Sequence, residues 1–396
     1  MYQFRNSYLI EFFHENKNKR WFYIFLILLL LKIVLSIIPP LFSTDFLRNL
    51  FYGEAFWNFG FQVYDLSPIE IDPNYDILDP TTQIKAYQYT PYDYPIIQIL
   101  FWAITSLLPF SLVTGKWVLL IFDVTNFFLI RDLLKERESK FEKDAVSLFY
   151  FAFMLIISTI EGQAEGITLF FMLLALKYIN KKPLYSYAII AIGVQWKYIP
   201  IILLPYLIYQ QRKDLKQIIK GISIFSILNI ILSFPILISD YVLHYIIYGG
   251  ELPNDQIPSN PMAWMYSIDL DQLYLSSFIL WIIIFYIFFQ ILISPLLNYL
   301  KEKDENRSNF LRYYSESFFQ RFEKFMVLLP ILLFLKYYRF AFSWYWLWLI
   351  PGILTNDNVH RKRLWISFLI LFPVMIFDTI SLTKNWGFIL NFFGLG

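Results

Sequence analysis

Apolar runs separated by short polar segments extend along the whole chain. The first run covers residues 21–42, and a polar, aromatic-rich segment of residues 43–94 follows it. Runs of this kind are typical of membrane helices, so the pattern predicts an all-α integral membrane protein with one polytopic domain over residues 1–396. The remaining helices are expected within residues 95–382, some of them broken or tilted because their runs are short. These runs cover residues 95–111, 115–130, 145–160, 163–178, 184–197, 198–210, 220–239, 272–297, 325–338, 343–356 and 364–382.

Positive charges predict which loops face the cytoplasm, because Lys and Arg are enriched on that side. The polar lead before the first run ends in Lys17, Lys19 and Arg20, so we expect a membrane anchor with a cytoplasmic N-terminus rather than a cleaved signal. Cation-rich loops lie near residues 131–143, 180–182, 211–220, 301–324 and 361–363. All of them face the cytoplasm only if residues 95–111 form a re-entrant or interfacial helix. We then expect a bundle of about eleven transmembrane helices.

The segment of residues 43–94 holds eight carboxylates but only Arg48 and Lys85 as cations, so we expect a long first loop at the extracytoplasmic surface. Apolar residues at helical spacing in its first part predict a short amphipathic helix in the membrane interface. Residues 71–80 are rich in turn-forming residues and predict an exposed loop. The loop 241–271 has no Lys or Arg and should face the same side.

Composition excludes several other classes of protein. Charged residues make up 16% of the chain, whereas a soluble domain carries about 25%. The lack of cysteine removes disulfides, thiol nucleophiles and thiolate metal ligands, and three scattered histidines do not form a zinc site. The triplet 269–271 matches a short metal–nucleotide motif, but three letters match easily by chance. We expect no metal, no cofactor and no nucleic-acid partner.

The predicted topology gathers four polar features on the outer side of the membrane. They are the segment 43–94, the turn 161–166, the turn 195–198 and the segment 336–346. Carboxylates and isolated cations would thus meet at one membrane face. Such a face is suited to an anionic lipid headgroup.

Two charged positions have competing interpretations. Asp45 is either the N-cap of the helix that follows it or a general base that takes a proton from an acceptor hydroxyl. Lys197 interrupts an apolar run, where a charge is costly unless it is paired or hydrated. It is either a lysine that extends to the interface or a phosphate contact. Arg339, between Tyr338 and Phe340, supports the phosphate interpretation.

Glu161 and Glu165 flank Gly162 and Gly166 in the second polar feature. The two carboxylates either lie at a helix start, where the dipole favours them, or contact a substrate that the glycines let approach. Aromatic residues are expected mainly in interfacial belts and packing. A minority could stack on a sugar, namely Tyr89, Tyr92 and Tyr94.

The order of these motifs resembles that of a known superfamily. Asp45 after the first run is followed by the stretches 60–65, 87–95, 161–166, 193–200 and 343–351. This order is similar to that of the polytopic GT-C glycosyltransferases that use lipid-phosphate sugars. The nearest branches are the GPI mannosyltransferase I (PIG-M) type and the bacterial and archaeal glycosyltransferase family 87. The resemblance covers about residues 40–355.

The resemblance implies a GT-C-like bundle and a hexosyltransferase active at the extracytoplasmic face. Its donor would be a polyprenyl- or dolichyl-phosphate hexose, with mannose expected, and its acceptor a lipid-linked or other extracytoplasmic glycan. Asp45 would be the catalytic base, and Lys197 would lie near the donor phosphate together with Arg339. The other expected substrate contacts are Glu54, Tyr89, Asp93, Glu161, Gln163, Glu165, Trp344 and Tyr345. The first-loop acid is not part of a DxD, and Glu165 stands where Asp or Ser is common, so the second acidic role and the sugar stay open.

Two other classes compete with this prediction. A transporter or lipid flippase could use the same acid–cation cluster as a translocation site, and a non-catalytic assembly subunit would tolerate the loss of Asp45. Transporters commonly show inverted repeats with paired broken helices, and the sequence shows no such repeat. A long outer loop suits an enzyme better. It would lie in the plasma membrane of a prokaryote or the ER membrane of a eukaryote.

Overall fold

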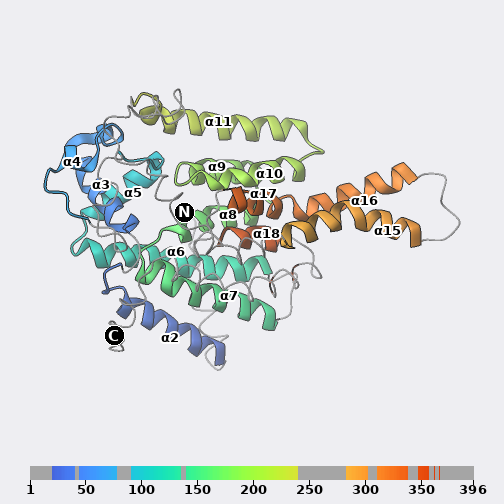
Figure 1. Ribbon diagram of the computed structural model, residues 1–396, viewed down its shortest axis with the longest axis horizontal. Coiled ribbons are helices and arrows are strands. Elements are labelled where there is room, and N and C mark those ends of the chain that lie inside the picture. The colour runs from blue at the N-terminus through green and yellow to red at the C-terminus, as the bar shows by residue number, and fades with distance from the viewer. Residues whose placement is uncertain are drawn as a thin grey trace, which may run out of the picture.

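The computed structural model describes residues 20–40, 44–77, 91–134, 140–239, 282–301, 310–337 and 347–355, together with Arg361 and Trp365. The secondary structure of these residues is helical and contains no strand, which confirms the predicted all-α class. Figure 1 shows one set of helices side by side in a stack. The stack contains α2 (Arg20–Leu35), α6 (Ser111–Leu134), α7 (Lys140–Met154), α8 (Glu165–Tyr178), α9 (Pro183–Val194), α10 (Leu204–Gln210) and α11 (Leu215–Leu237).

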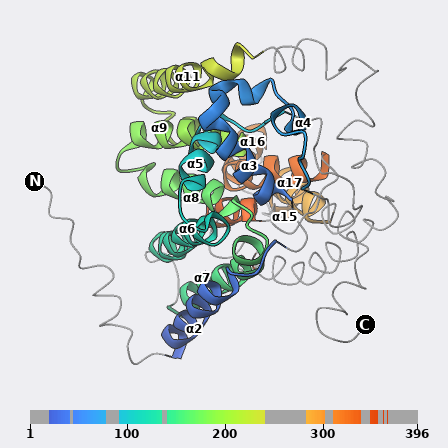
Figure 2. The same cartoon turned by 90° about the vertical axis from the view of Figure 1, so that its left-hand side faces the viewer.

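Further helices lie at the two ends of this stack. At one end are α3 (Asp45–Phe59), α4 (Pro68–Ile71) and α5 (Ile96–Ser106), and from the other end project α15 (Ser294–Lys301) and α16 (Phe310–Phe325) (Figure 1). Seen from the α3 end, the row from α11 through α9, α8, α6 and α7 to α2 is curved, and α3 and α5 lie in front of it (Figure 2). Two further short helices are α17 (Leu328–Tyr337) and α18 (Leu349–Leu354).

Parts of the described helices expose apolar side chains. Among the described residues, Lys143–Ile160 and Leu215–Leu237 are long and apolar enough to cross a membrane, by length and composition. Along α11 the large apolar side chains are exposed, with Ile230, Ile231 and Phe234 each above 60%. A helix that is apolar on its exposed face is suited to contact with lipid. The count of about eleven spans stays a prediction.

Contacts between distant segments sort the connecting loops into two groups. Arg131 pairs with Asp144, Lys177 pairs with Asp132 at 2.8 Å, and the Tyr209 hydroxyl donates to Glu323 at 3.1 Å. Gln211 also donates to the Ile179 carbonyl at 3.2 Å, so these contacts bring together the ends of helices that flank the loops 131–143, 180–182, 211–220 and 301–324. The opposite, α3 end gathers the other group, where the Ser239 hydroxyl donates to Asp65 Oδ1 at 2.7 Å.

Helix α3 confirms the predicted amphipathic helix, and α5 packs directly against it. The two backbones approach closely at Gly53, where an added Cβ would lie 2.4 Å from the carbonyl oxygen of Trp102. Helix α5 has 11 residues. Its length of about 16 Å is half of the hydrocarbon core of about 30 Å. Helix α9 has 12 residues and is nearly as short, so the prediction that residues 95–111 do not cross the membrane stays a prediction.

The prediction of a fully exposed loop over residues 71–80 is wrong at Tyr75. This side chain is 2% exposed, and its ring centroid lies 5.0 Å from that of Phe51 in an edge-to-face contact. The turn chemistry is present beside it, since Asp72 accepts a bond from the backbone N–H of Asn74 at 2.9 Å. An aromatic side chain in a polar turn can therefore seat that turn on α3.

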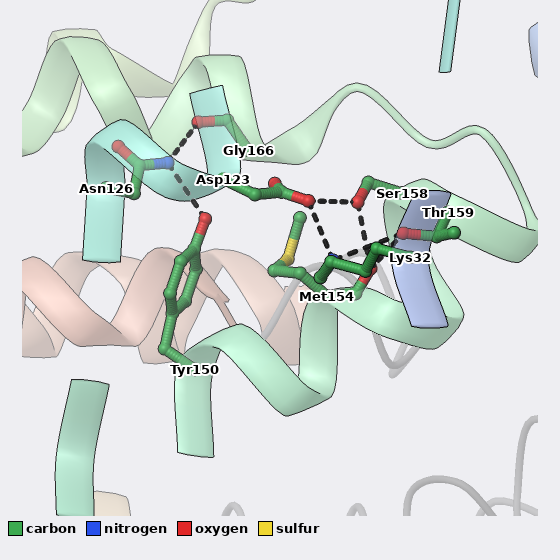
Figure 3. A network of polar contacts seen from close by, with 8 residues as sticks. All are labelled: Lys32, Asp123, Asn126, Tyr150, Met154, Ser158, Thr159 and Gly166. Carbon is green, nitrogen blue, oxygen red and sulfur yellow. Dashed lines mark hydrogen bonds and ion pairs between the residues drawn. The ribbon is translucent and has the colours of Figure 1, made fainter. Parts of the chain in front are cut away.

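A buried polar network ties the first helix to the centre of the stack (Figure 3). Lys32 of α2 donates to Asp123 of α6 at 2.9 Å and to Thr159 at 3.2 Å, and the Ser158 hydroxyl also contacts Asp123. Asn126, one turn further along α6, donates to the Gly166 carbonyl at 2.6 Å. Buried charges are tolerated when they are paired in this way. The network holds the start of α8 in place.

Candidate active site

A small pocket lies at the α3 end of the stack. Four of the predicted site residues line it, although they come from separate parts of the chain. The lining residues are Asp45, Asn49, Tyr94, Gln98, Gln163, Ala164, Glu165, Thr168, Trp196 and Lys197. A carboxylate, a carboxamide and an acid–cation pair therefore meet in one place.

Asp45 is the first residue of α3, and Thr44 holds the N-cap position without a side-chain cap bond. The interpretation of Asp45 as the N-cap is therefore wrong. Its half-buried side chain accepts a hydrogen bond of 3.2 Å from Gln163 Nε2. The carboxylate at the pocket is thus oriented by a residue from another element.

Gln163 reaches Asp45 because of the glycine before it. Gly162 has φ +71°, a backbone conformation that residues with a Cβ rarely adopt. An added Cβ there would lie 2.5 Å from Cγ of Phe46, the residue after Asp45. The turn can therefore lie directly against the start of α3. Glycine is required at this position for two independent reasons.

Glu165 and Lys197 form an ion pair at the pocket wall. The Glu165 side chain is 2% exposed, and its second oxygen accepts a bond of 2.9 Å from Nε1 of Trp348. The Lys197 side chain is 20% exposed, and its ammonium lies 5.8 Å from the ring centroid of Tyr94 and 5.4 Å from that of Trp348. Glu165 therefore holds the cation from behind while aromatic rings flank it.

The turn that carries Lys197 depends on close packing. The backbone N–H of Lys197 donates to the carbonyl of Gly193 at 2.9 Å. An added Cβ on Gly193 would lie 2.8 Å from Cβ of Phe171 and 3.2 Å from Cβ of Pro200. The N–H of Ile97 donates to the carbonyl of Gln195 at 2.9 Å, which joins this turn to the start of α5.

Arg48 fixes the end of the segment 43–94, called the outer segment below, beside the pocket. Its buried guanidinium donates to Asp93 Oδ1 at 3.0 Å and to the Pro91 carbonyl at 2.9 Å. Asp93 itself is exposed and does not line the pocket. The ion pair therefore positions the chain that leads to Tyr94.

The remaining predicted residues divide into two groups. Glu54 is exposed on α3, and Glu161 is buried at the end of the π-helical turn η2 (Leu155–Ile160), so neither lines the pocket. Gly162 turns the chain between Glu161 and Glu165, which sends the two carboxylates in different directions. Tyr89, Arg339, Trp344 and Tyr345 lie outside the described residues, as do the triplet 269–271 and the loop 241–271.

Several lining residues were not predicted as site residues from the sequence. Gln98 and Thr168 stand alone among apolar neighbours, and Asn49 lies on the inner face of α3. Single polar residues in apolar helices commonly bond to their own backbone, so their signal in a sequence is weak. The side chain of Trp196 is buried, and its ring centroid lies 5.0 Å from that of Phe101 in an edge-to-face contact, so in the sequence it resembles an ordinary packing residue.

Two tyrosines of the outer segment, Tyr64 and Tyr92, are buried beside the pocket. Burial raises the pKa of Tyr92 well above its ordinary value, and burial followed by the nearby Tyr198 and Asp93 raises that of Tyr64. Both hydroxyls stay protonated at neutral pH, and Tyr92 donates to Asn49 at 3.2 Å. Among the described tyrosines of this end, these two therefore do not serve as bases.

The fold and the pocket together define a class, namely a helical protein with membrane-type helices and an acid–cation pocket at one end. Residues 92–249 match the family model of glycosyltransferase family 87, whose members are membrane enzymes. The match agrees with the resemblance to glycosyltransferase family 87 over these residues and supports a membrane glycosyltransferase of the GT-C superfamily. The resemblance to the PIG-M type stays a prediction. It includes α5 to α11 and, with them, Gln163, Glu165 and Lys197. Comparison with the curated proteins gives no match, and comparison with the solved structures gives none.

Proposed function

We propose that this protein transfers a hexose, with mannose expected, from a polyprenyl- or dolichyl-phosphate to a lipid-linked or other extracytoplasmic acceptor. The observation that carries the proposal is the pocket in which Asp45 and Lys197 meet, at the end of the stack opposite the cation-rich loops. The family match independently supports a glycosyltransferase. The finer identities of donor, sugar and acceptor rest on the resemblance and on this chemistry.

The proposed step is a single displacement with inversion. The acceptor hydroxyl oxygen attacks C1 of the hexose, and Asp45 takes the hydroxyl proton. A new C1–O bond forms while the bond between C1 and the phosphate oxygen breaks, and the lipid phosphate leaves with the bonding electrons. Lys197 balances the charge that develops on this leaving group, with Arg339 as a proposed second cation.

The Glu165–Lys197 pair suits this role because it holds the ammonium without withdrawing it from the pocket. A charged hydrogen bond to a phosphate oxygen is stronger than a neutral one. Lys197 is the more exposed partner of the pair, so it can contact a phosphate while Glu165 stays buried behind it. The charge of the leaving group can be balanced by side chains, so the step needs no metal in principle.

The pocket end is proposed to face away from the cytoplasm in a multi-pass protein. This proposal is supported by the contacts of Arg131, Lys177 and Glu323, which lie at helix ends next to cation-rich loops. Because such loops are retained in the cytoplasm, the pocket would open at the extracytoplasmic face.

The test is transfer of radiolabelled mannose from a polyprenyl-phosphate mannose by the purified protein, with a membrane lipid extract as the source of acceptor. We expect transfer by the wild type and its loss in both Asp45→Asn and Lys197→Ala. Full transfer by both variants would show the assignment to be wrong. Movement of the labelled lipid across reconstituted vesicles without any new glycoside would favour the transporter or flippase instead.

A further inference from the structure

Two buried polar groups in the pocket lack partners within the described part of the chain. They are Oε1 of Gln98, a side chain that is 3% exposed, and the hydroxyl of Thr168, which is 0% exposed. Buried polar groups in native proteins are nearly always hydrogen-bonded. Both residues line the pocket. We therefore expect the molecule that binds in the pocket to supply their hydrogen-bond partners.

The hydroxyl of Thr168 differs in its hydrogen bonding from those of other threonines within helices. A Ser or Thr inside a helix commonly donates to the carbonyl four residues earlier. Thr105 bonds to Phe101 in this way at 2.8 Å, and Thr125 bonds to Ile121 at 2.7 Å. Thr168 has no such bond to Ala164 among the described contacts. Its buried hydroxyl thus has no hydrogen-bond partner among the described residues.

The two groups belong to elements that also position the Glu165–Lys197 pair. Thr168 follows Glu165 by three residues on α8, so both face the same side of the helix. Gln98 follows Ile97, whose N–H is bonded to the turn that carries Lys197. The carboxamide and the hydroxyl therefore lie in the same pocket as the ammonium that we assign to phosphate.

The chemistry of these groups identifies the part of the substrate that they suit. A carboxamide oxygen only accepts hydrogen bonds, so it needs an O–H or N–H donor. An isoprenoid chain and an ionised phosphate supply no such donor. A hexose supplies several hydroxyl groups, each of which both donates and accepts.

We propose that Gln98 and Thr168 bind hydroxyl groups of the hexose on the donor and so determine which hexose the enzyme accepts. This inference rests on the proposed function and adds the residues that recognise the sugar. A site built to bond a substrate hydroxyl discriminates strongly against an analogue that lacks it, because its own polar groups are then left unpaired.

The test compares two probes, a polyprenyl phosphate and the same lipid carrying mannose, by equilibrium binding to the purified protein. The variants are Thr168→Val, which removes the hydroxyl at nearly constant shape, Thr168→Ser, which keeps it, and Gln98→Met. The matched control is Thr105→Val, because Thr105 is also buried but lies outside the pocket lining. Dissociation constants and thermal unfolding are measured for each protein.

We expect Thr168→Val and Gln98→Met each to weaken binding of the mannosyl lipid about tenfold and to leave binding of the plain lipid phosphate unchanged. Thr168→Ser and Thr105→Val should bind both lipids as the wild type does. Thr168→Val should unfold no earlier than the wild type, because it loses no protein hydrogen bond.

Three outcomes would overturn the inference. They are equal weakening of both lipids, no weakening of either, and early unfolding of Thr168→Val, which would reveal a protein partner for the hydroxyl. A wild type that binds neither lipid would instead overturn the proposed function, and the sugar assignment with it.

Discussion

Gln163 Nε2 lies 3.2 Å from Oδ2 of Asp45 and donates a hydrogen bond to it from the turn before α8 to the start of α3. The bond orients the proposed base from outside its own helix. We expect Gln163→Leu to lower the transfer rate about tenfold by loosening this orientation, with little change in donor affinity. The measurement is kcat and KM for the polyprenyl-phosphate mannose. A variant with wild-type kcat would show that Gln163 does not position Asp45.

Gly162 and Gly60 provide a matched pair for testing how the turn is built. Both have positive φ, but an added Cβ would meet Phe46 at 2.5 Å in one case and nothing within 4 Å in the other. Gly60 has φ +57° and ψ −135°, a conformation that is sparsely populated by residues with a Cβ, so we expect Gly60→Ala to lower the free energy of unfolding by about 1–3 kcal/mol from the backbone alone. Gly162→Ala adds overpacking and should lower it by about 2–4 kcal/mol. Equal losses in thermal or denaturant unfolding would contradict the packing of the turn on Phe46.

Removing either partner of the Lys197–Glu165 pair should have unequal effects. Lys197→Met leaves a carboxylate that is 2% exposed without its cation, so we expect the free energy of unfolding to fall by about 3–5 kcal/mol. Glu165→Gln should lower the free energy of unfolding by less, because the more exposed ammonium of Lys197 can be hydrated. The double variant should regain most of the stability but no transfer activity. Recovery of activity in the double variant would show that Lys197 acts only through Glu165 and not on the phosphate.

The alkaline stability of the protein should report whether the outer segment is seated on α3. Burial raises the pKa of Tyr75 to about 12 from an ordinary value near 10. The folded state therefore keeps the phenol proton that the unfolded state loses, and this contribution to stability is present below pH 10 and is lost as the pH rises from 10 to 12. We expect Tyr75→Phe to reduce the decline in melting temperature over that range. An identical decline in both proteins would mean that Tyr75 is exposed.

Part of the site could be predicted from the sequence. Lys197 stood out because it interrupts an apolar run, Asp45 because it follows the first run, and Gln163 and Glu165 because they lie in a polar turn. The structure brings these four residues into one pocket. Their partners could not be foreseen in the same way. Which side of the turn Glu161 occupies depends on the positive φ of Gly162, a backbone property that the residue type allows but does not impose.

The fold shows the same division. The apolar runs predict helices, and the structure has helices over the described runs, whereas the crossing or non-crossing of residues 95–111 stays a prediction. The Lys32–Asp123 pair has a sequence signal, since each charge lies within an apolar run, but pairing across 91 positions needs the packed helices. The orphaned Gln98 and Thr168 have no such signal, because lacking a partner is a property of the folded pocket.

The most direct test of the central claim separates donor binding from turnover in Asp45→Asn. The matched control is Asp76→Asn, an exposed aspartate of the same outer segment that does not line the pocket. If Asp45 is the base, Asp45→Asn should bind the polyprenyl-phosphate mannose with wild-type affinity while kcat falls about 10²–10⁴-fold, and Asp76→Asn should match the wild type in both. Wild-type kcat in Asp45→Asn, or an equal loss in Asp76→Asn, would contradict the account.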